Sequence, residues 1–110
     1  MTLFLVETYV IKPEKQAEFM AYKEKWKQFF AYKENRPQLF EEVKSYRMFA
    51  QMFGGNVGGY VETWEFDNLA KCDEFFHKVM QSDYPTKLYP EFASLLVPAT
   101  YTMNVWNSIT

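Results

Sequence analysis

The chain has 110 residues, a formal net charge of −2 and a pI of about 5.4. Because 48% of its residues are hydrophobic and 20% are aromatic, the composition excludes a disordered chain and favours one domain spanning residues 1–110. The slightly acidic balance gives no general attraction to nucleic acid or to an anionic membrane surface.

The single cysteine, Cys72, cannot form an internal disulfide, which fits a reducing compartment. The sequence has no basic region followed by an apolar signal segment, and no apolar stretch long enough to span a bilayer. We therefore expect a cytoplasmic protein without membrane partners. Cys72 falls on the apolar face of an expected helix, so we interpret it as a core residue rather than a reactive thiol.

The first part of the chain predicts a strand and a long helix. Residues 2–11 alternate two sets of side chains that are both mainly apolar, so this strand should be covered on both faces. Lys12-Pro13-Glu14 favours a helix start, and the pattern stays helical to about Glu34, where Asn35-Arg36-Pro37 should end it. The apolar stripe of this helix is more typical of a core than of a cofactor site. The stripe consists of Phe19, Tyr22, Trp26, Phe29 and Phe30.

Two further strands should form a hairpin. Residues 43–53 predict the second strand, and a glycine-rich turn at 54–59 leads into the third, which ends at Phe66. The turn does not determine the hairpin register, and a shift of one residue exchanges the side chains beside Trp64. The two alternatives are Tyr46, Met48 and Met52, or Arg47, Phe49 and Phe53.

The last part of the chain predicts two helices and a final strand. Asp67 or Asn68 can cap a helix over residues 69–81. Its apolar face should contain Leu69, Cys72, Phe75, Phe76, Val79 and Met80. After a break at 82–85 and one possible turn at 86–89, a short helix at 90–97 and a strand at 99–106 complete the chain.

The resulting order, β-α-β-β-α-(short α)-β, predicts an α+β protein with the ferredoxin-like arrangement. Helices in this topology cover one face of the sheet, whereas several of the strands are apolar on both faces. The simplest explanation is that the sheet of a second copy covers the other face. We therefore expect a homodimer, with the possibility of a larger assembly.

Two titratable residues are candidates for a functional site. Glu62 shares a strand face with Trp64, where apolar neighbours would raise its pKa unless a cation compensates. A structural ion pair with Arg47 or a lysine is the more common reason for such a placement than a functional carboxylate. His77 is the only histidine, so one subunit cannot build a three-histidine zinc site. It is either a surface residue or a base that faces Trp64.

The pattern resembles the dimeric α+β barrel superfamily, and within it NIPSNAP-like and antibiotic-biosynthesis-monooxygenase-like domains. The resemblance rests on Glu7-Thr-Tyr-Val-Ile-Lys12-Pro13, on Tyr60-Val-Glu-Thr-Trp64-Glu-Phe66-Asp67 and on Phe92-Ala-Ser-Leu95-Leu96-Val97-Pro98. It implies a homodimer whose two sheets form a shared barrel, with a cavity between each sheet and its helices. The superfamily includes cofactor-independent oxygenases, haem-degrading proteins and isomerases.

The resemblance also guides the choice of site residues. A strand tryptophan with a polar residue four positions earlier lines the cavity of the oxygenases, and Trp64 with Tyr60 has that spacing. The haem-degrading members have a first-strand asparagine, where this chain has Val6 or Glu7, and a helix tryptophan, where it has Phe75 or Phe76. Haem degradation is therefore not expected.

We expect the cavity to bind a small apolar or aromatic molecule without a bound cofactor or metal. Its expected lining is Tyr60, Glu62, Trp64, Phe76, His77 and Trp26. If the protein is an enzyme, Glu62 or His77 would act as the base in oxygenation or isomerisation of a phenolic substrate. The alternative is a non-catalytic structural dimer in which these side chains only pack.

Overall fold

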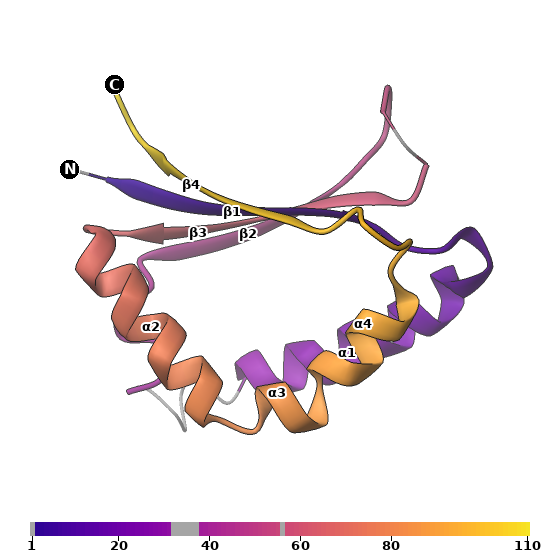
Figure 1. Ribbon diagram of the computed structural model, residues 1–110, viewed down its shortest axis with the longest axis horizontal. Coiled ribbons are helices and arrows are strands. Elements are labelled where there is room, and N and C mark those ends of the chain that lie inside the picture. The colour runs from indigo at the N-terminus through magenta and orange to yellow at the C-terminus, as the bar shows by residue number, and fades with distance from the viewer. Residues whose placement is uncertain (1, 32–37, 56) are drawn as a thin grey trace.

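The computed structural model describes residues 2–31, 38–55 and 57–110, which form a four-stranded sheet with helices on one side (Figure 1). The elements in chain order are β1 (Leu3–Val10), the 3-10 turn η1 (Pro13–Lys15), α1 (Gln16–Ala31), β2 (Ser45–Ala50), β3 (Gly59–Phe66), α2 (Leu69–Gln81), α3 (Tyr84–Lys87), α4 (Tyr89–Leu95) and β4 (Thr102–Asn107).

The strand order in the sheet is β2-β3-β1-β4, and every neighbouring pair is antiparallel. This order confirms the α+β, ferredoxin-like fold that the sequence predicts. In Figure 1 the helices lie below the sheet, and no helix among the described residues covers the opposite face. Among the described residues, none of the helices combines the length and the apolar character needed to cross a bilayer.

The register decides which side chains face the helices. Tyr46 of β2 lies opposite Trp64 of β3, so the first of the two alternatives for the hairpin is correct for Tyr46 and Met48. Met52, by contrast, lies beyond the end of the strand. On the other side of β3, Leu5 pairs with Trp64 and Glu7 pairs with Glu62. Because side chains alternate along a strand, all these paired residues face the helical layer.

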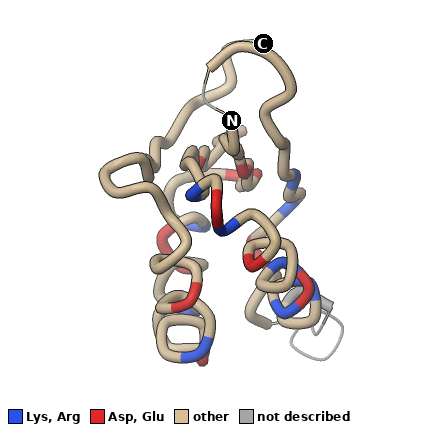
Figure 2. Tube along the Cα trace, turned by 90° about the vertical axis from the view of Figure 1, so that its right-hand side faces the viewer, with Lys and Arg blue, Asp and Glu red and all other residues tan. Residues whose placement is uncertain are grey.

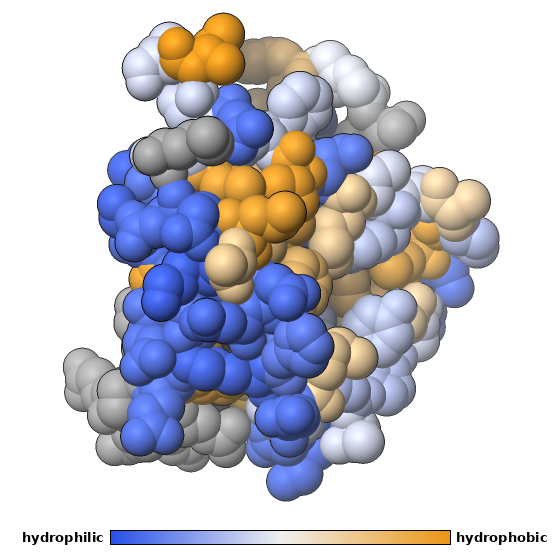
Figure 3. Space-filling view, turned by 60° about the vertical axis from the view of Figure 1, so that its left-hand side comes forward, coloured by the Kyte–Doolittle hydropathy of each residue, from blue (hydrophilic) through white to orange (hydrophobic). Residues whose placement is uncertain are grey.

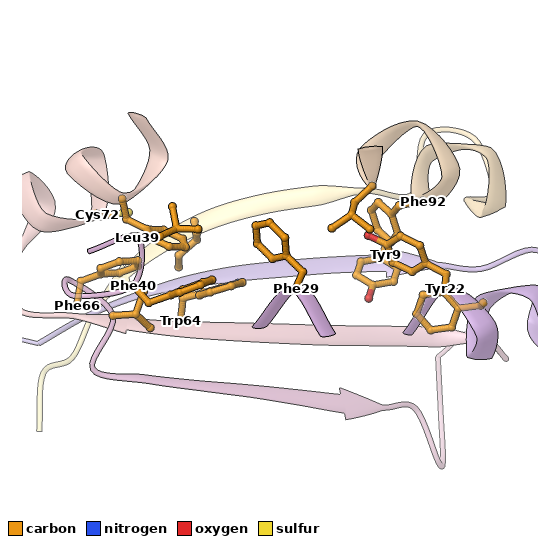
Figure 4. Close-up of a cluster of buried hydrophobic side chains, with 14 of the residues drawn as sticks. Tyr9, Tyr22, Phe29, Leu39, Phe40, Trp64, Phe66, Cys72 and Phe92 are labelled. Carbon is orange, nitrogen blue, oxygen red and sulfur yellow. The ribbon is translucent and has the colours of Figure 1, made fainter. Parts of the chain in front are cut away.

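The core fills the space between the sheet and the helices. Figure 4 shows two groups of buried side chains, one around Trp64, Phe66, Phe40 and Cys72 and the other around Tyr9, Tyr22 and Phe92. Phe29 of α1 lies between the two groups. Burying an aromatic side chain of this size contributes about 1.5–3 kcal/mol, so these rings account for much of the driving force for folding.

Two local features hold the elements in place. The side chain of Asn68 accepts a hydrogen bond from the backbone N–H of Lys71 at 2.9 Å, which confirms that this residue caps α2. Gly58 has a φ of +84° in the turn before β3, and a Cβ there would lie 2.9 Å from the carbonyl oxygen of Ile11. Only glycine fits that position without a shift of the backbone.

Several element boundaries differ from those predicted. β2 ends at Ala50 rather than 53, because Gly54 and Gly55 take positive φ values and leave Met52 and Phe53 outside the ladder and exposed. β4 begins at Thr102 rather than 99, after a turn in which the Thr100 hydroxyl donates to the carbonyl oxygen of Val97.

The helices also differ in part from the prediction. Pro13 begins a 3-10 turn before α1, and the predicted end of that helix at 34–37 lies outside the described residues. The predicted break at 82–85 contains the start of α3, since proline is compatible with the first turn of a helix. On α2, Leu69 and Met80 are exposed rather than part of the apolar face.

The surface separates charged from apolar regions. Figure 2 shows that Lys, Arg, Asp and Glu lie mainly along the helices. Figure 3 shows apolar side chains gathered near the end of the molecule where α2 begins and β4 ends. The exposed apolar residues there include Leu69 and Val105, which line a shallow surface hollow.

Candidate functional site

A cavity of about 80 Å³ lies between the sheet and the helices. Its lining combines aromatic rings from every helix of the layer with side chains from β1, β2 and β3. The lining residues are Glu7, Tyr9, Phe19, Tyr22, Lys23, Trp26, Phe29, Met48, Glu62, Trp64, Phe75, Val79, Tyr84 and Phe92. Because Tyr9 and Trp64 belong to the two core groups of Figure 4, the cavity lies between those groups.

Two carboxylates face each other on the sheet side of this cavity. Glu7 of β1 and Glu62 of β3 are direct partners in the antiparallel ladder, and both point toward the helices. Glu62 is 8% exposed, and Glu7 is partly buried. Like charges directly opposite each other destabilise a sheet, so this pair needs specific support.

Hydrogen bonds from aromatic side chains supply that support. Tyr9 donates its hydroxyl to Glu62 Oε2 at 2.7 Å, and Tyr46 donates to Glu62 Oε1. The indole N–H of Trp64 donates to Glu7 Oε1 at 2.7 Å, and the hydroxyl of Tyr101 donates to Glu7 Oε2. Each of the four carboxylate oxygens therefore accepts a hydrogen bond from this chain.

The environment changes the proton affinity of the pair. Burial and, to a smaller extent, the charge of Glu62 raise the pKa of Glu7 to about 7, although the hydrogen bonds from Tyr101 and Trp64 act in the opposite direction. Burial and the nearby carboxylates raise the pKa of Tyr9, Tyr46 and Tyr101. These phenols therefore stay protonated as donors, and Glu7 is the group that exchanges a proton near neutral pH.

One cation lies in the same cavity. The ammonium group of Lys23, from α1, is 5.0 Å from the ring centroid of Trp26 and donates to the sulfur of Met48. Burial lowers the pKa of Lys23, and the charge of Glu62 opposes that change. Lys23 is thus the lysine that interacts electrostatically with Glu62. Of the two kinds of cation that the sequence offered as partners of Glu62, Arg47 or a lysine, Arg47 is excluded, because it is exposed and pairs with Thr63 on the opposite sheet face.

The residues predicted for the site divide into two sets. Glu62, Trp64 and Trp26 line the cavity together. Tyr60 packs on Phe19 and donates its hydroxyl to Gln16, but it is not part of the lining. Phe76 lines the surface hollow beside β4 instead.

His77 lies away from the cavity. Its imidazole is 72% exposed, and Nδ1 lies 3.0 Å from the carbonyl oxygen of Asp73 in the preceding turn of α2. Phe75 is the α2 residue that packs on Trp64, with ring centroids 5.1 Å apart. A residue two positions later is rotated by about 200° around a helix, so His77 is the surface residue of the two alternatives and does not face Trp64.

Sequence reasoning missed Glu7, Tyr9, Tyr46, Tyr101 and Lys23 as parts of the site. Glu7 carried a usable signal, because it is an acid on the same strand face as Leu3, Leu5 and Tyr9. The contribution of Tyr46 depends on the register, which the sequence left open. Among the described residues, His, Cys, Asp and Glu side chains form no group of three or more that could hold a metal ion.

No protein-family model matches the chain, and no curated protein matches it. Solved structures do match it. A NIPSNAP family protein from Agrobacterium tumefaciens aligns with a TM-score of 0.72 and 14% identity over 97% of this chain and 92% of that one. A NIPSNAP-like domain protein from Burkholderia xenovorans aligns with a TM-score of 0.72 and 16% identity, over 99% of this chain and 86% of that one.

An antibiotic biosynthesis monooxygenase aligns with a TM-score of 0.64 and 17% identity, over 98% of this chain and 99% of that one. A protein with a ferredoxin-like fold from Bacteroides fragilis aligns with a TM-score of 0.65 and 11% identity, over 97% of this chain and 96% of that one. At these identities the likeness is one of fold. The chain therefore shares the ferredoxin-like α+β fold of NIPSNAP-like and antibiotic-biosynthesis-monooxygenase structures, which confirms the resemblance read from the sequence.

Proposed function

We propose that the chain binds a small molecule with an apolar or aromatic body in the cavity between sheet and helices. We further propose that Glu7, paired with Glu62, acts on this molecule as an acid–base group. The observation that carries the proposal is the pair of opposed carboxylates at an aromatic-lined cavity, with the pKa of Glu7 near 7. Groups with such perturbed pKa values in a cavity are candidates for functional sites.

The chemistry open to this pair is proton abstraction. The carboxylate of Glu7 would take a proton from an activated C–H or O–H group, and the electron pair would remain on the ligand as an enolate or phenolate. Returning that proton to another atom of the ligand gives isomerisation. Reaction of the anion with molecular oxygen would give oxygenation, and the antibiotic biosynthesis monooxygenase among the similar structures is in keeping with it.

Tryptophan fluorescence provides the test of binding. Trp26 and Trp64 line the cavity, whereas Trp106 is 60% exposed on β4. In a Trp106→Phe variant the emission reports on the cavity alone, and it should be quenched saturably by members of a panel of small phenols and amines. Bound compounds should also raise the melting temperature. The proposal fails if no compound changes either signal.

A pair of matched substitutions tests the carboxylates. Glu62→Gln removes a charge beside the cavity, while Glu65→Gln changes the opposite face of the same strand, where Glu65 accepts a hydrogen bond from Ser45. Ligand binding or turnover should fall in Glu62→Gln and remain at the wild-type level in Glu65→Gln. Equal effects in both variants would contradict a role for the pair.

We also propose that the protein is a homodimer that covers the helix-free face of the sheet. Phe49 is 50% exposed there and Trp106 is 60% exposed, and large exposed apolar areas are rare on monomers. The similar structure from Bacteroides fragilis is described as dimeric. Sedimentation should give twice the mass of the chain, and a monomer at all concentrations would refute this assembly.

Two observations favour a non-catalytic structural module as a second candidate. All four oxygens of Glu7 and Glu62 already accept hydrogen bonds from this chain. The cavity of about 80 Å³ is also smaller than the roughly 150 Å³ that holds benzene in an engineered protein core. A protein that responds to none of the panel compounds would support this candidate.

A further inference from the structure

A cation of the chain itself already lies in the cavity wall. The stem of Lys23 crosses from α1 toward β2, and its ammonium group contacts the Trp26 ring and the Met48 sulfur. Met48 lies directly opposite Glu62 in the ladder between β2 and β3. The cavity therefore accommodates an ammonium group next to Glu62.

The Trp26 ring that Lys23 contacts is one of three aromatic rings that form a corner. The ring of Tyr46 lies 4.9 Å from that of Trp26 and 4.4 Å from that of Trp64. The two indoles are 6.5 Å apart with their planes at 70°. Aromatic faces attract ammonium groups through their quadrupole, and such corners are a common way to bind organic cations. Glu62, which accepts from Tyr46, adds a negative charge at the same corner.

The charges at the cavity balance only while Glu7 holds its proton. Of the described residues that line it, Glu7 and Glu62 are acidic and Lys23 is basic. Lys23 contacts Trp26 and Met48, and its influence on Glu62 is through space. When Glu7 is ionised, the two carboxylates outnumber this one cation, and a positively charged ligand then supplies a counter-ion that a neutral or anionic ligand cannot supply.

We propose that the ligand of this cavity is a small primary or N-methylated amine, bound as its ammonium ion in the position that the Lys23 ammonium occupies between Trp26, Met48 and the carboxylate pair. This inference rests on the proposed binding function and names the class of ligand. The cavity volume of about 80 Å³ limits the amine to a few carbon atoms, unless withdrawal of Lys23 opens more space.

Three probes of one shape and different charge test the inference: isobutylamine, isobutanol and isobutyrate. The readout is the NMR signal of the indole N–H of Trp64, whose donor bond to Glu7 Oε1 lies at the cavity. Isobutylamine should shift this signal saturably, with a dissociation constant about tenfold lower than that of isobutanol. Isobutyrate should bind most weakly.

Substitutions of cavity residues test where the ammonium group of the ligand binds. Lys23→Met keeps an apolar stem but removes the competing ammonium, so isobutylamine should bind several-fold more tightly while isobutanol is unaffected. Glu62→Gln should weaken isobutylamine about tenfold, and Glu65→Gln, on the opposite sheet face, should leave it unchanged. If Glu62→Gln does not fold, the comparison of the three probes on Lys23→Met decides the question.

The outcomes separate this inference from the proposed function. If isobutanol or isobutyrate binds as tightly as isobutylamine, the cavity binds small molecules but does not select an amine, and the inference is wrong. The same conclusion follows if Lys23→Met weakens isobutylamine or leaves it unchanged. If none of the three probes shifts the Trp64 signal in the wild-type protein or in Lys23→Met, both the inference and the proposed binding function are overturned.

Discussion

Replacing Glu7 by glutamine should stabilise the protein above neutral pH and leave its stability almost unchanged below pH 5. The pKa of Glu7 is about 7 in the folded protein, against 4.5 for an unperturbed glutamate. Below pH 4.5 both the folded and the unfolded chain hold this proton, so the group does not favour either state. Between the two values the unfolded chain releases the proton while the folded chain keeps it, and the free energy of unfolding falls as the pH rises.

The size of this effect follows from the interval between the two pKa values. Each pH unit between 4.5 and about 7 lowers the free energy of unfolding by about 1.4 kcal/mol. The wild type therefore loses about 3 kcal/mol of stability by pH 8. Glutamine cannot ionise and therefore avoids this loss. Its carbonyl oxygen can still accept from the Trp64 indole, and its amide can donate to the hydroxyl oxygen of Tyr101.

Urea unfolding at a series of pH values, at equal protein concentration, measures the effect. The difference in unfolding free energy between Glu7→Gln and the wild type should rise from near zero at pH 4.5 to about 3 kcal/mol at pH 8. Glu65→Gln serves as the control and should show no such rise, because Glu65 faces away from the cavity. A difference that does not change with pH would show that Glu7 does not titrate near 7, and the acid–base proposal would lose its basis.

Four further substitutions test other parts of the argument. His77→Ala should change the unfolding free energy by less than about 0.5 kcal/mol and leave ligand-induced fluorescence changes intact, because the imidazole is exposed. Trp64→Phe removes a donor that lowers the pKa of Glu7, so the Glu7 carboxyl signal in carbon NMR should titrate above pH 7. Trp106→Glu places a charge on the exposed face of the sheet and should convert the proposed dimer to a monomer in sedimentation experiments. Phe19→Ala empties a fully buried position and should cost about 3–5 kcal/mol in urea unfolding.

The fold could be predicted from the sequence because its signals are local. Alternation along β1 and β3, the helical stripe of α1 and the cap of α2 by Asn68 each depend on residues within a few positions. The element ends were less predictable. The early end of β2 depends on the positive φ values of Gly54 and Gly55, which the residue type permits but does not require.

The site was less predictable because it depends on pairing between distant segments. Alternation placed Glu62 on the Trp64 face, and that placement is confirmed. The pairing of Glu7 with Glu62, and the arrival of Tyr46 beside Trp64, require a register that the glycine-rich turn leaves open. His77 shows the opposite case, since its helical phase relative to Phe75 was available from the sequence and points to solvent.

The hydrogen bonds around Glu7 bear on the choice between a structural and a ligand-binding role. The Trp64 indole can only donate, and the Tyr101 hydroxyl donates to the second oxygen, so this network suits an ionised carboxylate. Burial and the charge of Glu62 act against that ionised form. Replacing one of the two acids would remove this cost in stability, whereas a site that binds a cation uses the negative charge of both. The opposition between donors and burial thus leaves Glu7 balanced near neutral pH, where a bound ammonium ion would favour its ionised form.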